Sequence, residues 1–146
     1  MRLVARIRRE IAFLRNLNRT LGRVRSISKS SHNLACDDFE AAAAAHRDRP
    51  AITFEGVTLT YGELDQLANR YASWARSQNL LRGATVALVM PNRTDYAAVW
   101  LGLSKVGVTT ALINNQLTGP VLCHCLKLSG AKHILVDEET EGAVEA

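Results

Sequence analysis

The sequence predicts an α/β fold in which helices cover a parallel sheet. Three short runs, "TVALVM" at 85–90, "TTALI" at 109–113 and "KHILVD" at 132–137, are largely apolar and have the length of strands. Helical patterns separate these runs, and strands that alternate with helices pair in parallel inside a covered sheet. A chain of 146 residues also fits one domain and can bury a core.

Residues 1–30 are predicted to form a basic amphipathic arm, with one helix over 3–27. The arm holds nine basic residues and one acidic residue, a net charge of +8, whereas the remaining residues sum to −4. Most of its arginines fall on one side of a helical wheel. The apolar stripe on the other side consists of Val4, Ile7, Ile11, Leu14, Leu17, Leu21 and Val24.

Three roles remain open for this arm. Residues 1–28 suit the surface of an anionic membrane, which attracts basic amphipathic helices. The same helix can instead pack on the rest of the chain, here called the body, with its arginines in solvent. The Arg- and Ser-rich "RVRSISKSS" at 23–31 also resembles a mitochondrial transit peptide. Nucleic-acid binding is not expected, because the arm lacks interleaved aromatic residues and its stripe serves no such purpose.

Cysteine usage and hydropathy favour a cytoplasmic protein. The three cysteines are an odd number, and no apolar h-region of a signal peptide precedes them. The apolar runs are far shorter than the roughly 20 residues of a transmembrane helix. We therefore expect a cytoplasmic chain, peripheral on the inner face of the cell membrane if the arm binds lipid.

Residues 31–49 are predicted to be a linker and a short helix. "SKSSHN" at 28–33 has linker composition. Asp37 and Glu40 give a capping-box pattern that opens "FEAAAAAHR" at 39–47, and Pro50 ends the helical pattern.

Residues 50–146 are predicted to be an incomplete domain. "AITFEGVTLT" at 51–60 alternates about Glu55-Gly56, as a hairpin does. Thr60 and Glu63 form a second capping box before a helix that runs towards Gln78. Gly83 marks a turn. The apolar stripe of this helix consists of Leu64, Leu67, Tyr71, Trp74 and Ala75.

Two more helices are expected between the strands. The first, "DYAAVWLGLSKVG" at 95–107, should point Tyr96, Val99, Trp100 and Leu103 inward. The second, "VLCHCLKLSG" at 121–130, follows a Thr118 cap and ends at Gly130. "DEETEGAVEA" at 137–146 barely begins another element. Three parallel strands and a hairpin leave a sheet edge and face poorly covered, so part of a domain is expected.

The sequence contains one near match to a phosphate-binding loop. "GLSKVGVT" at 102–109 has the spacing G-x-x-x-x-G-K-[ST], but Val108 replaces the lysine. A phosphate loop follows a strand and opens a helix, whereas this segment closes a helix and leads into a strand. We reject it.

No metal site is predicted. Cys123 and Cys125 lie about 200° apart on a helix, so their thiolates cannot face one ion, and two buried small side chains flanking an amphipathic His124 are expected instead. The remaining histidines are scattered, and no disulfide is proposed for Cys36. These histidines are His32, His46 and His133.

No catalytic, cofactor-binding or metal-ligating residue is predicted. There is no G-x-S-x-G motif, and helix capping explains the acidic cluster of Asp37, Asp38 and Glu40. The loops Pro91 to Thr94 and Asn114 to Thr118 follow strands, where open α/β sheets bind ligands. Turn geometry is the preferred explanation for their asparagines, Asn92, Asn114 and Asn115.

The order of the segments nevertheless resembles a known family. "LTYGELDQLANRYASWA" at 59–75, "VALVMPNRTDYAAVWLGLSKVG" at 86–107, "ALINNQL" at 111–117 and "SGAKHILVD" at 129–137 look like the N-terminal part of adenylate-forming acyl-CoA synthetases. "ALIN" and "HCLKLSGAK" are similar to the very-long-chain acyl-CoA synthetases and fatty-acid transport proteins. "RVRSIS" and "DRPAITFEG" look like bacterial members. The resemblance covers roughly residues 50–137.

The resemblance implies a reaction that we do not expect this chain to perform alone. A fatty acid carboxylate attacks the α-phosphate of Mg·ATP to give acyl-adenylate and pyrophosphate, and coenzyme A then displaces AMP. The phosphate loop, the adenine- and ribose-binding residues and the catalytic lysine of the family all lie downstream of the matched segments. None of the matched positions is one of the family's functional residues, and none is carried over. A small departure is Gly83-Ala84, where the family usually has Gly-Asp.

Two hypotheses follow. In the first, the chain is an N-terminal fragment of a long- or very-long-chain fatty acyl-CoA ligase; the parent uses ATP, Mg²⁺ and coenzyme A, and the fragment binds none of them. In the second, the chain is a truncated, non-catalytic homologue that binds a membrane or a partner. An unrelated α/β binding domain would require the ordered segments to be coincidence.

Overall fold

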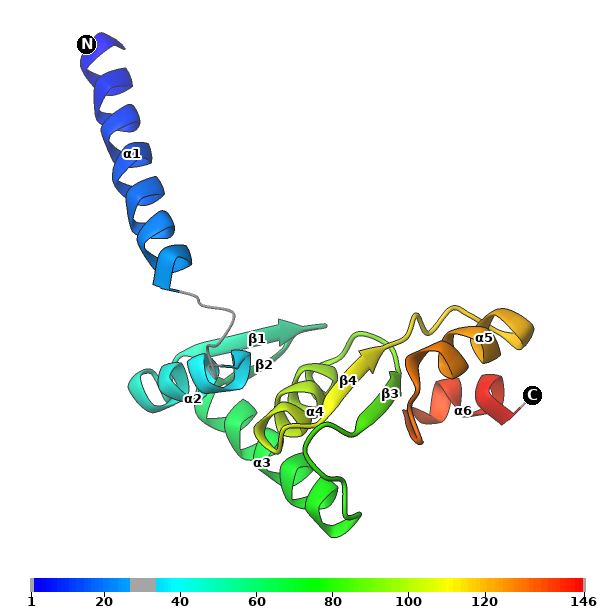
Figure 1. The fold of residues 1–146 in the computed structure, drawn as a ribbon. Coiled ribbons are helices and arrows are strands. Elements are labelled where there is room, and N and C mark those ends of the chain that lie inside the picture. The colour runs from blue at the N-terminus through cyan, green and yellow to red at the C-terminus, as the bar shows by residue number, and fades with distance from the viewer. Residues whose placement is uncertain (1, 27–33, 146) are drawn as a thin grey trace. The chain divides into compact units, whose positions relative to one another are not determined.

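The computed structural model describes residues 2–26 and 34–145. The chain divides into two units, Met1–Asn33 and Leu34–Ala146. In the first unit the structure describes one helix, α1 (Arg2–Ser26), which agrees with the predicted helix over 3–27 (Figure 1). The predicted linker at 28–33 lies outside the described residues. No described helix has both the length and the apolar character needed to cross a membrane.

The second unit opens with α2 (Ala35–Ala45), which begins earlier than the sequence predicted. Its N-cap position is Leu34, and Asp37 is the third residue of the helix rather than its cap. The Asp37 carboxylate accepts a hydrogen bond of 2.7 Å from the Leu34 N–H. Because a leucine side chain cannot accept a bond in return, only half of a capping box forms.

The predicted hairpin and its capping box are confirmed. β1 (Pro50–Phe54) pairs antiparallel with β2 (Val57–Thr60). Glu55 and Gly56 between them have φ of 48° and 81°, the left-handed conformation that a tight two-residue turn requires. α3 (Tyr61–Ser77) begins where the Thr60 hydroxyl accepts a bond from the Glu63 N–H and the Glu63 carboxylate accepts one from the Thr60 N–H.

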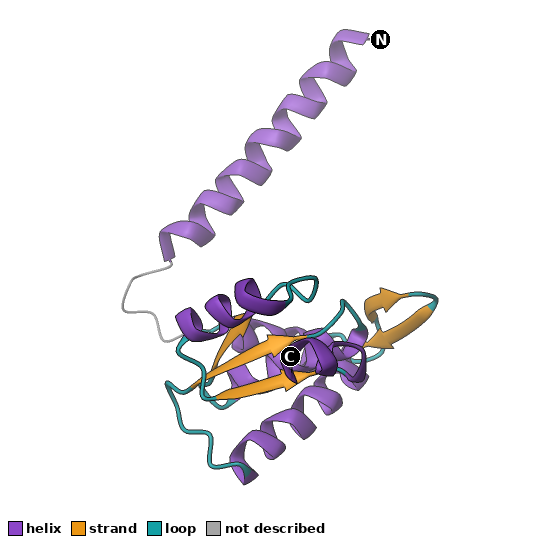
Figure 2. Ribbon diagram, turned by 90° about the vertical axis from the view of Figure 1, so that its right-hand side faces the viewer, coloured by secondary structure: helices purple, strands orange, loops and turns teal. Residues whose placement is uncertain are grey.

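Three parallel strands form the sheet in the order β4-β3-β5. These strands are β3 (Thr85–Val89), β4 (Thr109–Leu112) and β5 (His133–Val136). The helices that connect and follow them are α4 (Thr94–Lys105), α5 (Gly119–Ser129) and α6 (Glu138–Glu145). Figure 2 shows the strands side by side with helices packed against them. The α/β fold expected from the sequence is therefore present.

The core lies between β3, α3 and α4. One buried cluster joins β3 to α4 through Val86, Leu88, Val99 and Leu103. A second cluster joins α3 to α4 through Leu64, Ala68 and Ala98. The two helices approach so closely at Gly102 that a β-carbon there would lie 2.4 Å from the Ala68 carbonyl oxygen. Only glycine fits at this contact.

Two expectations for this region were wrong. Trp100 points outward with 42% of its surface exposed, because the buried face of α4 passes through Ala98, Val99 and Leu103. The exposure of the edge strands, 50% at Leu112 and 40% at Ile134, agrees with the expectation that part of the sheet is poorly covered. The acidic C-terminal segment forms the helix α6, with Asp137 accepting a 3.0 Å bond from the Glu139 N–H at its start.

Candidate functional site

The carboxyl ends of the three strands define one edge of the sheet. Because the strands are parallel, the segments that follow them emerge at this edge. Both loops singled out in the sequence, Pro91 to Thr94 and Asn114 to Thr118, follow strands there. The start of α6 follows β5 in the same way.

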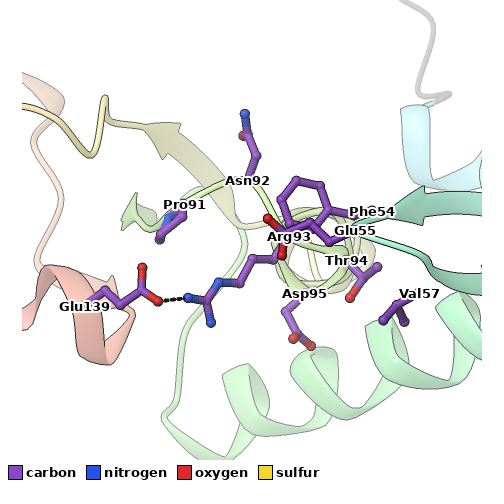
Figure 3. A pocket seen from close by; sticks show the side chains of 9 residues that line it. All are labelled: Phe54, Glu55, Val57, Pro91, Asn92, Arg93, Thr94, Asp95 and Glu139. Carbon is purple, nitrogen blue, oxygen red and sulfur yellow. Dashed lines mark hydrogen bonds and ion pairs between the residues drawn. The ribbon is translucent and has the colours of Figure 1, made fainter.

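A cavity of about 520 Å³ lies at this edge beside the tip of the hairpin. Figure 3 shows side chains from the hairpin, the loop after β3 and α6 converging on it. Its lining consists of Phe54, Glu55, Val57, Pro91, Asn92, Arg93, Thr94, Asp95 and Glu139. The sequence pointed to the loop but not to the hairpin or α6, which are distant along the chain.

Arg93 occupies the centre of this lining. It is the residue immediately before α4, and its guanidinium contacts Glu139 and lies 3.3 Å from Asp137 Oδ2. The hydrogen bond to Glu139, followed by the charge of Asp137, raises the pKa of Arg93 above its usual value. The ion pairs therefore link the loop after β3 to the start of α6.

Thr140 fixes α6 to the end of β3. Its side chain is buried, with 5% of its surface exposed. The hydroxyl donates a 2.7 Å hydrogen bond to the Val89 carbonyl oxygen and accepts one of 3.1 Å from the Asp137 N–H. Because both partners are main-chain groups, this one hydroxyl holds the wall that carries Asp137 and Glu139 in position.

The charges around the cavity do not favour a polyphosphate. Three carboxylates line it, those of Glu55, Asp95 and Glu139, against the single guanidinium of Arg93. A triphosphate requires clustered N–H donors and cations, and Arg93 is already paired. The residues that line this cavity therefore do not fit ATP or its Mg²⁺, and no step of a reaction is assigned to them.

Asn114 holds a turn, as the sequence suggested. Its side-chain oxygen accepts a 3.0 Å hydrogen bond from the Gln116 N–H, the pattern of an Asx turn. Asn92 lines the cavity and is exposed. The rejected segment Gly102 to Thr109 runs from the end of α4 into β4, the opposite order from a phosphate loop.

The cysteines and histidines that the structure describes form no metal-binding cluster. Cys123 is exposed and Cys125 is half-buried, so the prediction that both side chains are buried was wrong. α5 turns that position towards solvent and buries Leu122 instead. Among residues 2–26 and 34–145, no group of three His, Cys, Asp or Glu side chains could hold a metal ion. His32 lies outside the described residues.

The sequence did not predict the ion-pair cluster that Lys105 forms with Glu40 and Asp65. Its ammonium nitrogen lies 2.6 Å from Glu40 Oε1 and 2.7 Å from Asp65 Oδ1, and it donates a 2.9 Å bond to Asn69 Oδ1. Glu40 therefore pairs with Lys105 rather than capping α2. Burial alone would lower the pKa of Lys105, but hydrogen bonds to Asp65 and Glu40 together raise it.

Comparison with known proteins identifies the family. The family described as AMP-binding enzyme matches residues 39–146, which include the hairpin, the sheet and the cavity. The chain belongs to the AMP-binding enzyme family. Both the fold and the family expected from the sequence are thereby confirmed.

Curated relatives of this AMP-binding chain include long-chain fatty acid transport proteins. Long-chain fatty acid transport protein 6 of Homo sapiens is 33% identical over 110 residues, which cover 75% of the chain and 18% of that protein. Long-chain fatty acid transport protein 1 of Mus musculus is 31% identical over 139 residues, covering 94% of the chain and 21% of that protein. The chain spans only about a fifth of the length of these relatives.

Solved structures of acyl-CoA synthetases share the fold. A Mycobacterium tuberculosis fatty acyl CoA synthetase matches with a TM-score of 0.71 and 25% identity, over 75% of this chain and 22% of that chain. The N-terminal domain of FACL13 from the same organism gives the same score and identity, over 75% of this chain and 28% of that chain. The body therefore corresponds to part of the N-terminal domain of such an enzyme.

Proposed function

We propose that this chain forms part of the scaffold of a long- or very-long-chain fatty acyl-CoA ligase. The family match over residues 39–146 carries the proposal, because it places the whole sheet and its loops in the AMP-binding fold. The fatty acid transport proteins among its relatives support a fatty acid as the substrate. The proposed overall reaction converts fatty acid, ATP and coenzyme A to acyl-CoA, AMP and pyrophosphate.

The part played by the chain is structural. A carboxylate is a poor acyl donor, and the adenylate provides a better leaving group for the thiol of coenzyme A. Formation of the adenylate requires donors and cations around a pentavalent phosphate. The carboxylate-rich cavity beside Arg93 offers a poor environment for this charge. We therefore assign ATP, Mg²⁺ and coenzyme A binding to the portion that the longer relatives have in addition.

This proposal predicts a catalytically silent chain. Purified chain should give no ATP–pyrophosphate exchange above a protein-free control when Mg²⁺ and a long-chain fatty acid are supplied. Exchange that rises with the concentration of the chain, and that survives a further purification step, would show that the chain carries adenylation chemistry itself. A parallel reaction without fatty acid separates fatty-acid activation from exchange by a contaminating enzyme that adenylates another substrate.

A second candidate function is a non-catalytic binding module. It is favoured by the two apolar clusters that the body buries within itself, because they allow independent folding. A single cooperative thermal transition of the monomeric chain is expected for such a module. Aggregation without a transition would instead favour a chain that depends on further polypeptide, since exposed apolar side chains such as Leu128 then require a cover.

The ligase proposal also includes a location. A long acyl chain partitions into membranes, so an enzyme that activates it benefits from lying on a membrane surface. We place the protein in the cytoplasm, peripheral on the inner face of the cell membrane, with residues 1–28 as the segment that contacts lipid.

A further inference from the structure

α1 has two opposite faces with different chemistry. It is a continuous helix of 25 residues, which is about 37 Å long at the rise of an α-helix. Arg8, Arg9, Arg15 and Arg19 lie on one side. The apolar side chains whose exposure is described on the other side are Ile11, Phe13, Leu14, Leu17, Leu21 and Val24, between 41% and 61% exposed.

We propose that α1 lies flat on an anionic lipid surface, with this apolar face in the acyl-chain boundary and the arginines among the headgroups. The proposal rests on the ligase function only to explain why the chain would bind a membrane. The binding itself needs neither ATP nor fatty acid. No described helix, α1 included, has the length and apolar character to cross a membrane. In this proposal α1 therefore lies in the plane of the membrane interface. Its net charge of +8 over residues 1–30 complements anionic headgroups.

The width of the apolar face favours lipid over a second copy of the helix. A two-stranded coiled coil needs a narrow seam of two positions in seven, whereas Phe13, Leu17 and Val24 extend the apolar face to about half of the helix. Two copies of so basic a segment also repel each other, while an anionic surface neutralises the charge.

Glu10 interrupts the apolar face. It lies one turn before Phe13 and Leu14 and two turns before Leu17, and it is the only acidic residue of the arm. A carboxylate at this position faces both apolar lipid and anionic headgroups, and each opposes it. Glu10 therefore weakens binding and keeps it reversible.

Vesicle co-sedimentation of the full chain tests the proposal. Vesicles containing phosphatidylglycerol should bind the chain, whereas pure phosphatidylcholine vesicles should bind it at least tenfold more weakly, and added salt should release it. Arg8→Gln/Arg15→Gln/Arg19→Gln should weaken binding about tenfold or more, Leu14→Ser/Leu17→Ser should abolish it, and Glu10→Gln should tighten it severalfold.

A matched variant separates the effect of the charges on α1 from the effect of the net charge of the chain. Arg70→Gln/Arg76→Gln/Lys132→Gln removes the same three charges from exposed positions of the body and should bind as the unchanged chain does. Equal weakening by both triple variants would overturn the assignment to α1. If Leu14→Ser/Leu17→Ser still binds vesicles, the apolar face of α1 does not contact lipid and packs elsewhere. Self-association that this double variant abolishes, with no vesicle binding, would identify a second copy as the partner.

Discussion

The ammonium nitrogen of Lys105 lies 2.7 Å from Asp65 Oδ1, which joins the end of α4 to the first half of α3. The lysine side chain is only 8% exposed, and Glu40 brings α2 to the same nitrogen. The charge cluster therefore joins these three helices, and α3 and α4 also contact the hairpin whose tip lines the cavity.

Replacing Lys105 should destabilise the body measurably. Lys105→Ala leaves the half-buried Asp65 carboxylate without its positively charged partner and should lower the free energy of unfolding by about 2 kcal/mol. Urea denaturation followed by circular dichroism measures this change. Glu40→Gln should cost under about 1 kcal/mol, because half of the Glu40 side chain remains in solvent. A larger loss for Glu40→Gln than for Lys105→Ala would contradict this ranking.

The ion pairs of Lys105 also predict that the folded chain loses stability at alkaline pH. The pKa of Lys105 is raised in the folded chain, so its contribution to stability is complete below the unfolded value near 10.5 and is lost as the pH rises through the folded value. Burial raises the pKa of Tyr71 as well, which acts in the same direction. Melting temperatures between about pH 9 and 12 should therefore fall less steeply for Lys105→Met than for the unchanged chain. Equal slopes of melting temperature against pH for Lys105→Met and the unchanged chain would show that Lys105 does not contribute to the loss of stability.

Gly102 should tolerate no side chain. Gly102→Ala places a β-carbon against the Ala68 carbonyl and the Tyr71 side chain, which forces α3 and α4 apart. We expect a loss of about 2–3 kcal/mol in urea denaturation of the body. Gly22→Ala in α1 is the matched control, because apart from the adjoining backbone of the same helix nothing lies within 4 Å of the added carbon. That variant should leave the transition of the body unchanged.

Thr140 should control the order of the cavity wall. Thr140→Val preserves the shape of the side chain but removes the hydroxyl that bonds Val89 and Asp137. The free energy of unfolding should fall by about 1–2 kcal/mol, and the Asp137 amide should exchange with solvent faster by about tenfold. Thr140→Ser, which keeps the hydroxyl, should restore protection of that amide. If the Asp137 amide exchanges as fast in Thr140→Ser as in Thr140→Val, the hydroxyl does not protect that amide by itself, and this account of Thr140 is contradicted.

Local patterns account for what could be predicted from the sequence. The hairpin depends on Glu55-Gly56, and the start of α3 depends on Thr60 and Glu63, three residues apart. The strands could be identified because their apolar runs are short and helices separate them. Each of these features depends on residues within one or two turns of each other, where sequence spacing determines geometry.

Contacts between distant segments could not be predicted in this way. Lys105 meets Asp65 across 40 residues, and Thr140 meets Val89 across 51. Trp100 lies on the predicted side of a helical wheel, yet it belongs to neither of the two buried clusters and 42% of its surface is exposed. The cavity is built from the hairpin, the loop after β3 and α6, so its lining depends on tertiary packing that no local pattern encodes.

A chimeric synthetase tests the central claim most directly. Residues 39–146 of this chain would replace the matching segment of the Mycobacterium tuberculosis fatty acyl CoA synthetase, and formation of long-chain acyl-CoA would be measured with and without ATP. If the body is a scaffold of this enzyme class, the chimera should make acyl-CoA only with ATP, and Gly102→Ala within the insert should reduce its yield of folded protein. A chimera that melts as cooperatively as its parent yet forms no acyl-CoA would contradict the assignment.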